Sequence, residues 1–192
     1  MKMMNWIPLG ALLAAGSLFA GPITYDVIMT GPGESPPNAS PGTGFAVITI
    51  DTTTNSLNIV SETFGLLSTT TASHIHCCIA SPGATGVATQ VPSFSGFPLG
   101  VTAGTYSMSF NMTQASSWNP AFITASGGTA ALAESALAAG AAAGDAYLNI
   151  HTNMFPGGEI RGFLVATPEP STMALAIAAL AGLFLVSRVR SV

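Results

Sequence analysis

Residues 146–165 read AYLNIHTNMFPGGEIRGFLV, and this stretch decides the expected fold. Its two ends, 146–151 and 159–165, are short runs in which apolar and polar residues alternate, as in strands that bury one face. The Pro-Gly-Gly tripeptide at 156–158 supplies the residues of a tight turn. We therefore predict an antiparallel hairpin whose second strand returns beside His151.

Runs of the same kind continue toward the N-terminus, separated by Gly, Pro, Ser and Asn. With the hairpin they give seven expected strands, at 23–29, 44–50, 56–62, 72–79, 105–111, 146–151 and 159–165. Short strands at such spacing predict a mainly β fold, an antiparallel β-sandwich or Greek-key barrel.

One segment departs from this pattern. Residues 129–143 read TAALAESALAAGAAA, which has high helix propensity, and Thr129 can serve as the N-cap. We interpret the segment as a single helical crossover packed on the sheet. A flexible Ala/Gly linker is the alternative.

The N-terminus has the layout of a secretory signal peptide over residues 1–20. Lys2 precedes an apolar run from Ile7 to Ala20 that is broken by small residues. Cleavage is expected after Ser17 or Ala20. A membrane anchor is the alternative, although the run is short for a bilayer core.

The C-terminus, 167–192, carries three features in order. They are a Pro-Glu-Pro motif at 168–170, an apolar stretch that predicts a transmembrane helix over about 172–187, and a basic tail at 188–192. The individual residues are Pro168, Glu169, Pro170, Arg188 and Arg190. Arginines after the helix favour a cytoplasmic tail, with the preceding domain, 21–166, outside.

This C-terminal arrangement resembles the PEP-CTERM sorting signal of Gram-negative bacteria. The resemblance implies that a membrane exosortase recognises the chain and cleaves it near the Pro-Glu-Pro motif. It also implies an organism that makes extracellular polysaccharide. A permanent C-terminal anchor is the alternative.

Charge excludes several classes of function. Only 6% of the residues are charged, the net charge is −4, and no basic patch is available for a phosphate backbone, so nucleic acid is not an expected partner. Between the two terminal signals Arg161 is the single Lys or Arg. The chain also has no phosphate-binding loop and no nucleophile elbow, and we expect no enzymatic activity.

Side-chain parity places the polar residues of three expected strands on one face each. If these strands are neighbours in one sheet, the polar faces form a single surface. Its members are His74, His76, Asn149, His151, Glu159 and Arg161. We expect an acid to hold Arg161, and Glu159 is the nearest candidate on the same face.

The adjacent Cys77 and Cys78 fall on opposite faces of the expected strand. We expect a buried free Cys77 and an accessible Cys78. A disulfide between them is the alternative, and it requires a geometry that a regular strand does not supply.

Three motifs resemble the chordin-type CHRD domain: TGPGESPP at 30–37, HIH at 74–76 and YLNIHTNMFPGGEIRGFL at 147–164. The resemblance implies an extracellular β-sandwich-like module, as in bacterial surface proteins and in animal chordins that bind growth factors, without a general catalytic activity. The matching positions are Glu34, Pro36, Pro37, His74, His76, Asn149, His151, Pro156, Gly157, Gly158, Glu159, Arg161 and Gly162. Cys77 and Cys78 depart from the small residue that commonly follows the central motif.

His74 and His76, at i and i+2 of a strand, can both reach one ion, and His151 from a neighbouring strand completes a three-histidine set suited to zinc or copper. The further ligands of copper/zinc superoxide dismutases have no counterpart here. The competing interpretation is structural: the same side chains hydrogen-bond across strands and hold no cofactor.

Together these observations predict a secreted, non-enzymatic module of the cell surface or extracellular matrix, serving adhesion or association with biofilm polysaccharide. Expected partners are the exosortase, extracellular polysaccharide or surface proteins, and the membrane before processing. The expected route is an inner-membrane intermediate with the domain in the periplasm, followed by the cell surface. The alternative function is an exported copper- or zinc-binding protein that uses His74, His76 and His151, with redox activity as one option.

Overall fold

The structure, a computed structural model, describes residues 21–167. Its strands are β1 (Ile23–Thr30), β2 (Thr43–Asp51), β3 (Ser56–Phe64), β4 (Thr70–Cys77), β5 (Gly104–Asn111), β6 (Ala146–Thr152), β7 (Ile160–Phe163) and β8 (Val165–Ala166). Its helices are the 3₁₀ turn η1 (Ala115–Ser117), α1 (Pro120–Ala125) and α2 (Ala130–Ala143). All seven expected strands are present, and the last one is divided into β7 and β8.

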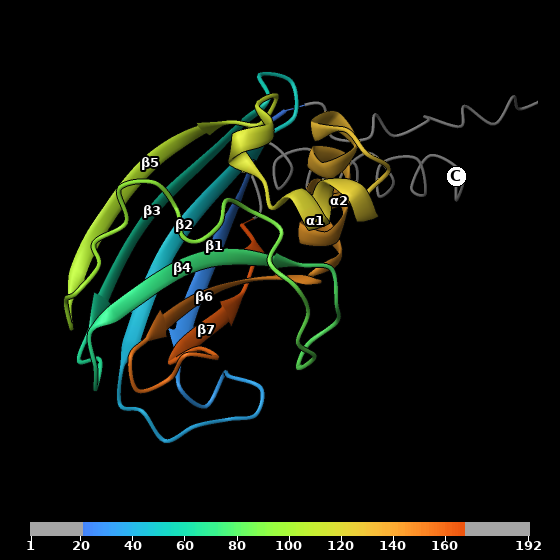
Figure 1. Cartoon of the computed structure of the whole chain (residues 1–192). Coiled ribbons are helices and arrows are strands. Elements are labelled where there is room, and N and C mark those ends of the chain that lie inside the picture. Colours follow the sequence, from blue (N-terminus) through green and yellow to red (C-terminus); the bar gives the residue numbers. More distant parts are fainter. Residues whose placement is uncertain (1–20, 168–192) are drawn as a thin grey trace, which may run out of the picture.

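The strands form one antiparallel sheet in the order β4-β6-β7-β1-β2-β3-β5, with β8 also paired to β1. The sheet is strongly curled, and β4 and β5 form its two edges (Figure 1). The mainly β, antiparallel prediction is therefore confirmed, and a single curled sheet stands in place of the expected sandwich or Greek-key barrel. Strand twist accumulates along a sheet, and here it bends a single sheet into a half-barrel.

The concave side of this sheet holds the apolar core. Alternate residues of β1, β2 and β3 are buried there, and their neighbours face outward. Val27, Ile48 and Ile59 are among the buried residues, and Ile28 and Phe45 are exposed.

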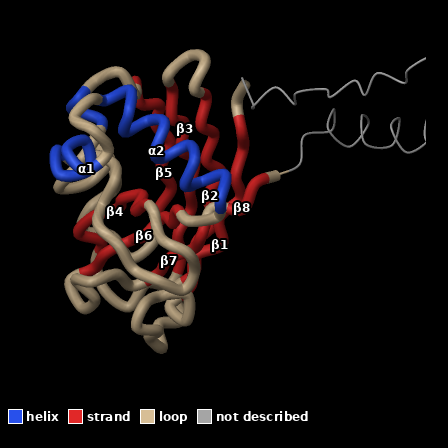
Figure 2. Tube along the Cα trace, turned by 90° about the vertical axis from the view of Figure 1, so that its right-hand side faces the viewer, coloured by secondary structure: helices blue, strands red, loops and turns tan. Residues whose placement is uncertain are grey.

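Helix α2 closes the core, as the sequence predicted for residues 129–143. Thr129 accepts a hydrogen bond from Leu132 N at 3.2 Å, and Gly144 ends the helix in the left-handed conformation at φ 77°. Ala133, Leu137 and Ala141 face the core, and the helix runs beside the sheet (Figure 2). The small side chains allow close packing.

A shorter helix, α1, was not predicted from the sequence. Asn119 caps it by accepting from Ala121 N at 3.0 Å, and Pro120 occupies its first turn. The preceding Trp118 is 2% exposed and donates its indole N–H to Met112 O at 2.9 Å. Trp118 therefore belongs to the core, and Phe122 and Ile123 of α1 are partly buried against it.

Cys77 and Cys78 form a disulfide, so the expectation of free cysteines is wrong. Strand β4 ends at Cys77, and the pair lies at the strand end, where the geometry of a regular strand is no longer imposed. The two sulfur atoms lie 4.0 and 3.5 Å from the Ala136 carbonyl of α2, and Gly140 faces them.

No helix among residues 21–167 is long and apolar enough to cross a membrane. The expected signal peptide at 1–20, the Pro-Glu-Pro motif at 168–170, the helix at about 172–187 and the basic tail at 188–192 lie outside the described residues.

Replacing Gly140 with Ala tests the packing of α2 against the disulfide. In an exposed helix this change stabilises by about 1 kcal/mol. Here the new Cβ would overlap Sγ of both Cys77 and Cys78, and we expect a loss of about 1–3 kcal/mol in the free energy of unfolding. Chemical denaturation measures it.

The exposed Ala139 supplies the control on the same helix. Ala139→Gly should lose about 1 kcal/mol through propensity alone. A Gly140→Ala protein more stable than wild type would contradict the predicted contact.

Candidate metal centre

The centre lies on one face of the neighbouring strands β4, β6 and β7. Asn149 of β6 pairs with His74 of β4 on one side and with Arg161 of β7 on the other, while His76 pairs with Tyr147 and Ala72 with His151. The adjacency that the parity argument required is therefore present. It brings the expected polar residues together, with the exception of Glu159, described below.

The three histidine rings meet above this face. Their centroids are 5.2 Å apart for His74 and His151, 5.9 Å for His74 and His76, and 6.0 Å for His76 and His151. One nitrogen from each ring can be chosen so that all three lie within 4.8 Å of one another. A small shift of the rings would bring them to the ~2.0 Å that zinc requires from each nitrogen.

A backbone carbonyl of a covering loop orients each ring. His74 Nε2 lies 2.7 Å from Pro92 O, His76 Nδ1 lies 2.8 Å from Thr85 O, and His151 Nδ1 lies 2.9 Å from Pro156 O. A carbonyl oxygen only accepts, so these ring nitrogens donate and carry the hydrogen. The opposite nitrogen of each neutral ring then presents a lone pair.

Those opposite nitrogens are Nδ1 of His74 and Nε2 of His76 and His151. All three are buried and have no hydrogen-bond partner within residues 21–167. An unpartnered buried polar atom costs about 1–3 kcal/mol. Three such atoms, one on each ring of this cluster, fit a metal ion, whose binding would satisfy them together.

Burial also keeps the rings uncharged. It lowers the pKa of all three histidines, and it lowers the pKa of His76 to about 4. The carbonyl hydrogen bonds act in the opposite direction and do not overcome it. The neutral imidazole is the form that binds metal.

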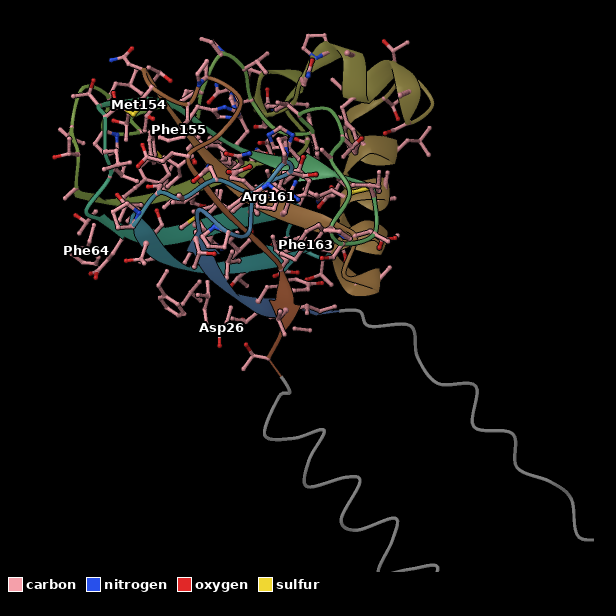
Figure 3. All side chains as sticks on the ribbon, turned by 90° about the horizontal axis from the view of Figure 1, so that it is seen from below. Asp26, Phe64, Met154, Phe155, Arg161 and Phe163 are labelled. Atoms are coloured by element: carbon pink, nitrogen blue, oxygen red, sulfur yellow. A yellow bond between two sulfur atoms is a disulfide. The ribbon has the colours of Figure 1, made fainter. Side chains whose placement is uncertain are left out.

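Arg161 holds the covering loops on this face. It is 1% exposed, and it donates Nε to Gly33 O at 2.6 Å, Nη1 to Gly83 O at 3.0 Å and Nη2 to Pro82 O at 2.7 Å. Its Cζ lies 4.6 Å from the centre of the Tyr147 ring. In Figure 3 Arg161 lies inside the molecule, whereas Asp26 and Phe64 lie at its periphery.

The acid beside Arg161 is Glu34, not Glu159 as expected. Glu34 Oε2 lies 3.9 Å from Arg161 Nε. The carboxylate of Glu159 instead accepts from Ser40 Oγ at 2.6 Å, Leu67 N at 2.6 Å and Thr152 Oγ1 at 2.7 Å. Gly158, at φ 132°, redirects the chain before β7 begins at Ile160, so strand parity does not extend to Glu159.

Glu34 is a site residue that parity could not find, because it lies in a loop. Its place in the TGPGESPP stretch, which resembles the first loop of the CHRD domain, was the available signal. Burial raises the pKa of Glu34 to about 7, although Arg161 and hydrogen bonds from Ser35 and Asn149 lower it in part. Glu34 also lines two surface clefts, of about 300 and 410 Å³.

Two glycines of the closing hairpin allow close packing. A Cβ at Gly158 would lie 2.6 Å from Glu34 Oε1 and 2.5 Å from Asn149 Oδ1, and one at Gly162 would overlap the Ile28 carbonyl. A side chain at either position would displace the strands or loops that build the face. Gly157 has open space around it and contributes only to the turn.

A family model described as the CHRD domain matches residues 25–164, which includes all the strands and loops of the centre. No curated protein and no solved structure matches the chain.

Replacing Arg161 with Ala should destabilise the domain strongly. Three carbonyl groups would lose their donor and Glu34 its partner, so we expect a loss of at least about 3 kcal/mol. Lys cannot reproduce the guanidinium fork, and Arg161→Lys should recover only part of it. Denaturant unfolding measures both.

The exposed Asp26 provides a control, because Asp26→Ala should change stability by no more than about 0.5 kcal/mol. A loss below ~1 kcal/mol for Arg161→Ala, the size of an exposed ion pair, would contradict the assigned role.

The pKa of Glu34 predicts a pH effect of known sign. A carboxyl whose folded pKa is raised to about 7 stabilises the fold below its ordinary value of 4.5, and this contribution is lost as the pH rises through 7. Glu34→Gln replaces the carboxyl with a neutral amide, so the variant does not lose this stability as the pH rises. Relative to wild type, the variant should therefore become more stable between pH 5 and pH 8, measured on metal-free protein.

The histidines titrate in both proteins, so their contribution cancels in that comparison. A stability difference that is constant with pH, or that changes in the opposite direction, would show that burial does not raise this pKa.

Proposed function

The chain belongs to the CHRD domain family, and from that premise we propose that it is an exported module that binds one copper or zinc ion through His74, His76 and His151. Membership of the family supports an extracellular, secreted location. The proposal of a metal site rests instead on the histidines of this chain.

The observation that carries the proposal is that each of three clustered histidine rings has a buried nitrogen with no partner in residues 21–167. In metal sites the second nitrogen of a ligating histidine is typically held by a carbonyl or a carboxylate. Here Pro92, Thr85 and Pro156 hold those second nitrogens. Each ring therefore has one nitrogen held by a carbonyl and a second nitrogen that can bind the metal.

A purely structural role for the histidines agrees less well with the same contacts. Such a role would have the rings hydrogen-bond to one another or to Asn149 across the strands. The ring hydrogen bonds of the described residues go to loop carbonyls instead. Without a metal, each inward nitrogen only adds a cost to folding.

We propose further that the module works at the cell surface without catalysis, in adhesion or in association with biofilm polysaccharide. The order of the Pro-Glu-Pro motif, apolar segment and arginines supports sorting by an exosortase through an inner-membrane intermediate. In producing cells, Ala at all of 168–170 should leave the protein in the membrane fraction. Release equal to wild type would argue against this route.

Elemental analysis of the purified full-length protein tests the metal proposal. We expect one copper or zinc ion per chain. His74→Ala, His76→Ala and His151→Ala should each raise the Kd by at least about 100-fold, which is about 2.7 kcal/mol. Saturating metal should also raise the unfolding temperature of wild type.

Asn153→Ala is the matched control, because Asn153 is exposed and follows β6 directly. It should retain the metal. Wild type that binds no more metal than the histidine variants would overturn the proposed function.

A further inference from the structure

We infer that the centre binds monovalent copper more tightly than divalent zinc. This inference rests on the proposed function and specifies which metal ion the site binds. The reason is that no negative charge lies among the three histidine rings in the described residues.

All the donors that the chain provides are uncharged. The group of side chains close enough to share one ion consists of His74, His76 and His151, and within residues 21–167 it contains no carboxylate. Three neutral imidazoles leave the charge of a bound ion uncompensated. The burial of the donor nitrogens removes water as well, so the protein must bear the cost of desolvating the ion.

That cost depends steeply on charge. The free energy of transfer from water to a medium of low polarity rises with the square of the ionic charge, so a divalent ion loses about four times as much as a monovalent ion of the same size. A zinc ion held by three histidines completes its four ligands with a water molecule, and the burial of the donor nitrogens restricts that water here. Monovalent copper is stable with three nitrogen ligands.

The nearest charged residues do not supply the missing negative charge. Tyr147 stacks on His76 with centroids 4.7 Å apart and planes 9° apart, and Arg161 lies over the other part of this stack, 4.6 Å from the Tyr147 centroid. Glu34 is paired with Arg161. The pair is neutral when Glu34 is ionised and positive when Glu34 is protonated, so in neither state does it favour a divalent ion.

Glu159, the other buried acid of the hairpin, is directed away. Its carboxylate receives the hydroxyl of Thr152, and Thr152 faces the opposite side of β6 from His151 by strand alternation. Ser40 and Leu67 occupy its remaining acceptor positions. The sheet itself therefore separates this negative charge from the ring nitrogens.

The test measures both affinities on the full-length protein at pH 8. Cu⁺ is titrated without oxygen against a chromogenic Cu⁺ chelator, and Zn²⁺ against a chromogenic Zn²⁺ chelator. We expect the Kd for Cu⁺ to be at least about tenfold lower, which is about 1.4 kcal/mol.

Two substitutions shift the ratio of these affinities in opposite directions. Asn149→Asp is isosteric and adds a negative charge between His74 and Arg161, so it should narrow the preference by at least about tenfold. Glu34→Gln removes the anion beside Arg161 and should widen it. Asn58→Asp, on the outer face of β3, adds the same charge remotely and should leave the ratio unchanged.

The outcomes are distinguishable. Zn²⁺ bound as tightly as Cu⁺ would overturn the preference. A ratio of affinities that neither Asn149→Asp nor Glu34→Gln changes would overturn its electrostatic cause. Either result leaves the metal centre intact. Binding of neither ion would overturn the proposed function as well.

Discussion

The candidate centre depends on one constraint: backbone carbonyls of loops accept the hydrogen bonds of the donors that the sheet presents beneath them. Arg161 donates to Gly33, Pro82 and Gly83, and the rings donate to Thr85, Pro92 and Pro156. A carbonyl cannot donate in return, so it determines which nitrogen of each ring carries the hydrogen. The loops therefore define the chemistry of the site although they contribute no ligand.

This arrangement makes the metal-free fold locally costly. The inward nitrogens are desolvated and receive nothing in exchange. The buried carboxylate of Glu159, by contrast, accepts hydrogen bonds from three donors. Within one hairpin, therefore, the polar side chain of Glu159 is fully engaged, whereas the ring of His151 keeps one nitrogen without a partner among the described residues.

The sequence allowed much of this to be predicted, because strand alternation is a local property. Parity on residues 72–79 and 146–151 placed His74, His76 and His151 correctly once β4 and β6 paired. It failed at Glu159, where Gly158 changes the backbone direction, and it could not place Glu34, which reaches Arg161 from a distant loop. The disulfide and the single curled sheet depend on where β4 ends and on accumulated twist, and neither is encoded in a short window.

The burial of Arg161 also has a consequence for the environments that the domain tolerates. Between residues 21 and 167 it is the single Lys or Arg, and it is almost fully enclosed. Dissolved ions weaken attractions between charges that water separates, and they act far less on charges sealed from solvent. Because the fold keeps Arg161 out of their reach, the hydrogen bonds and ion pair of this side chain should contribute nearly the same stability in fresh water and in brine.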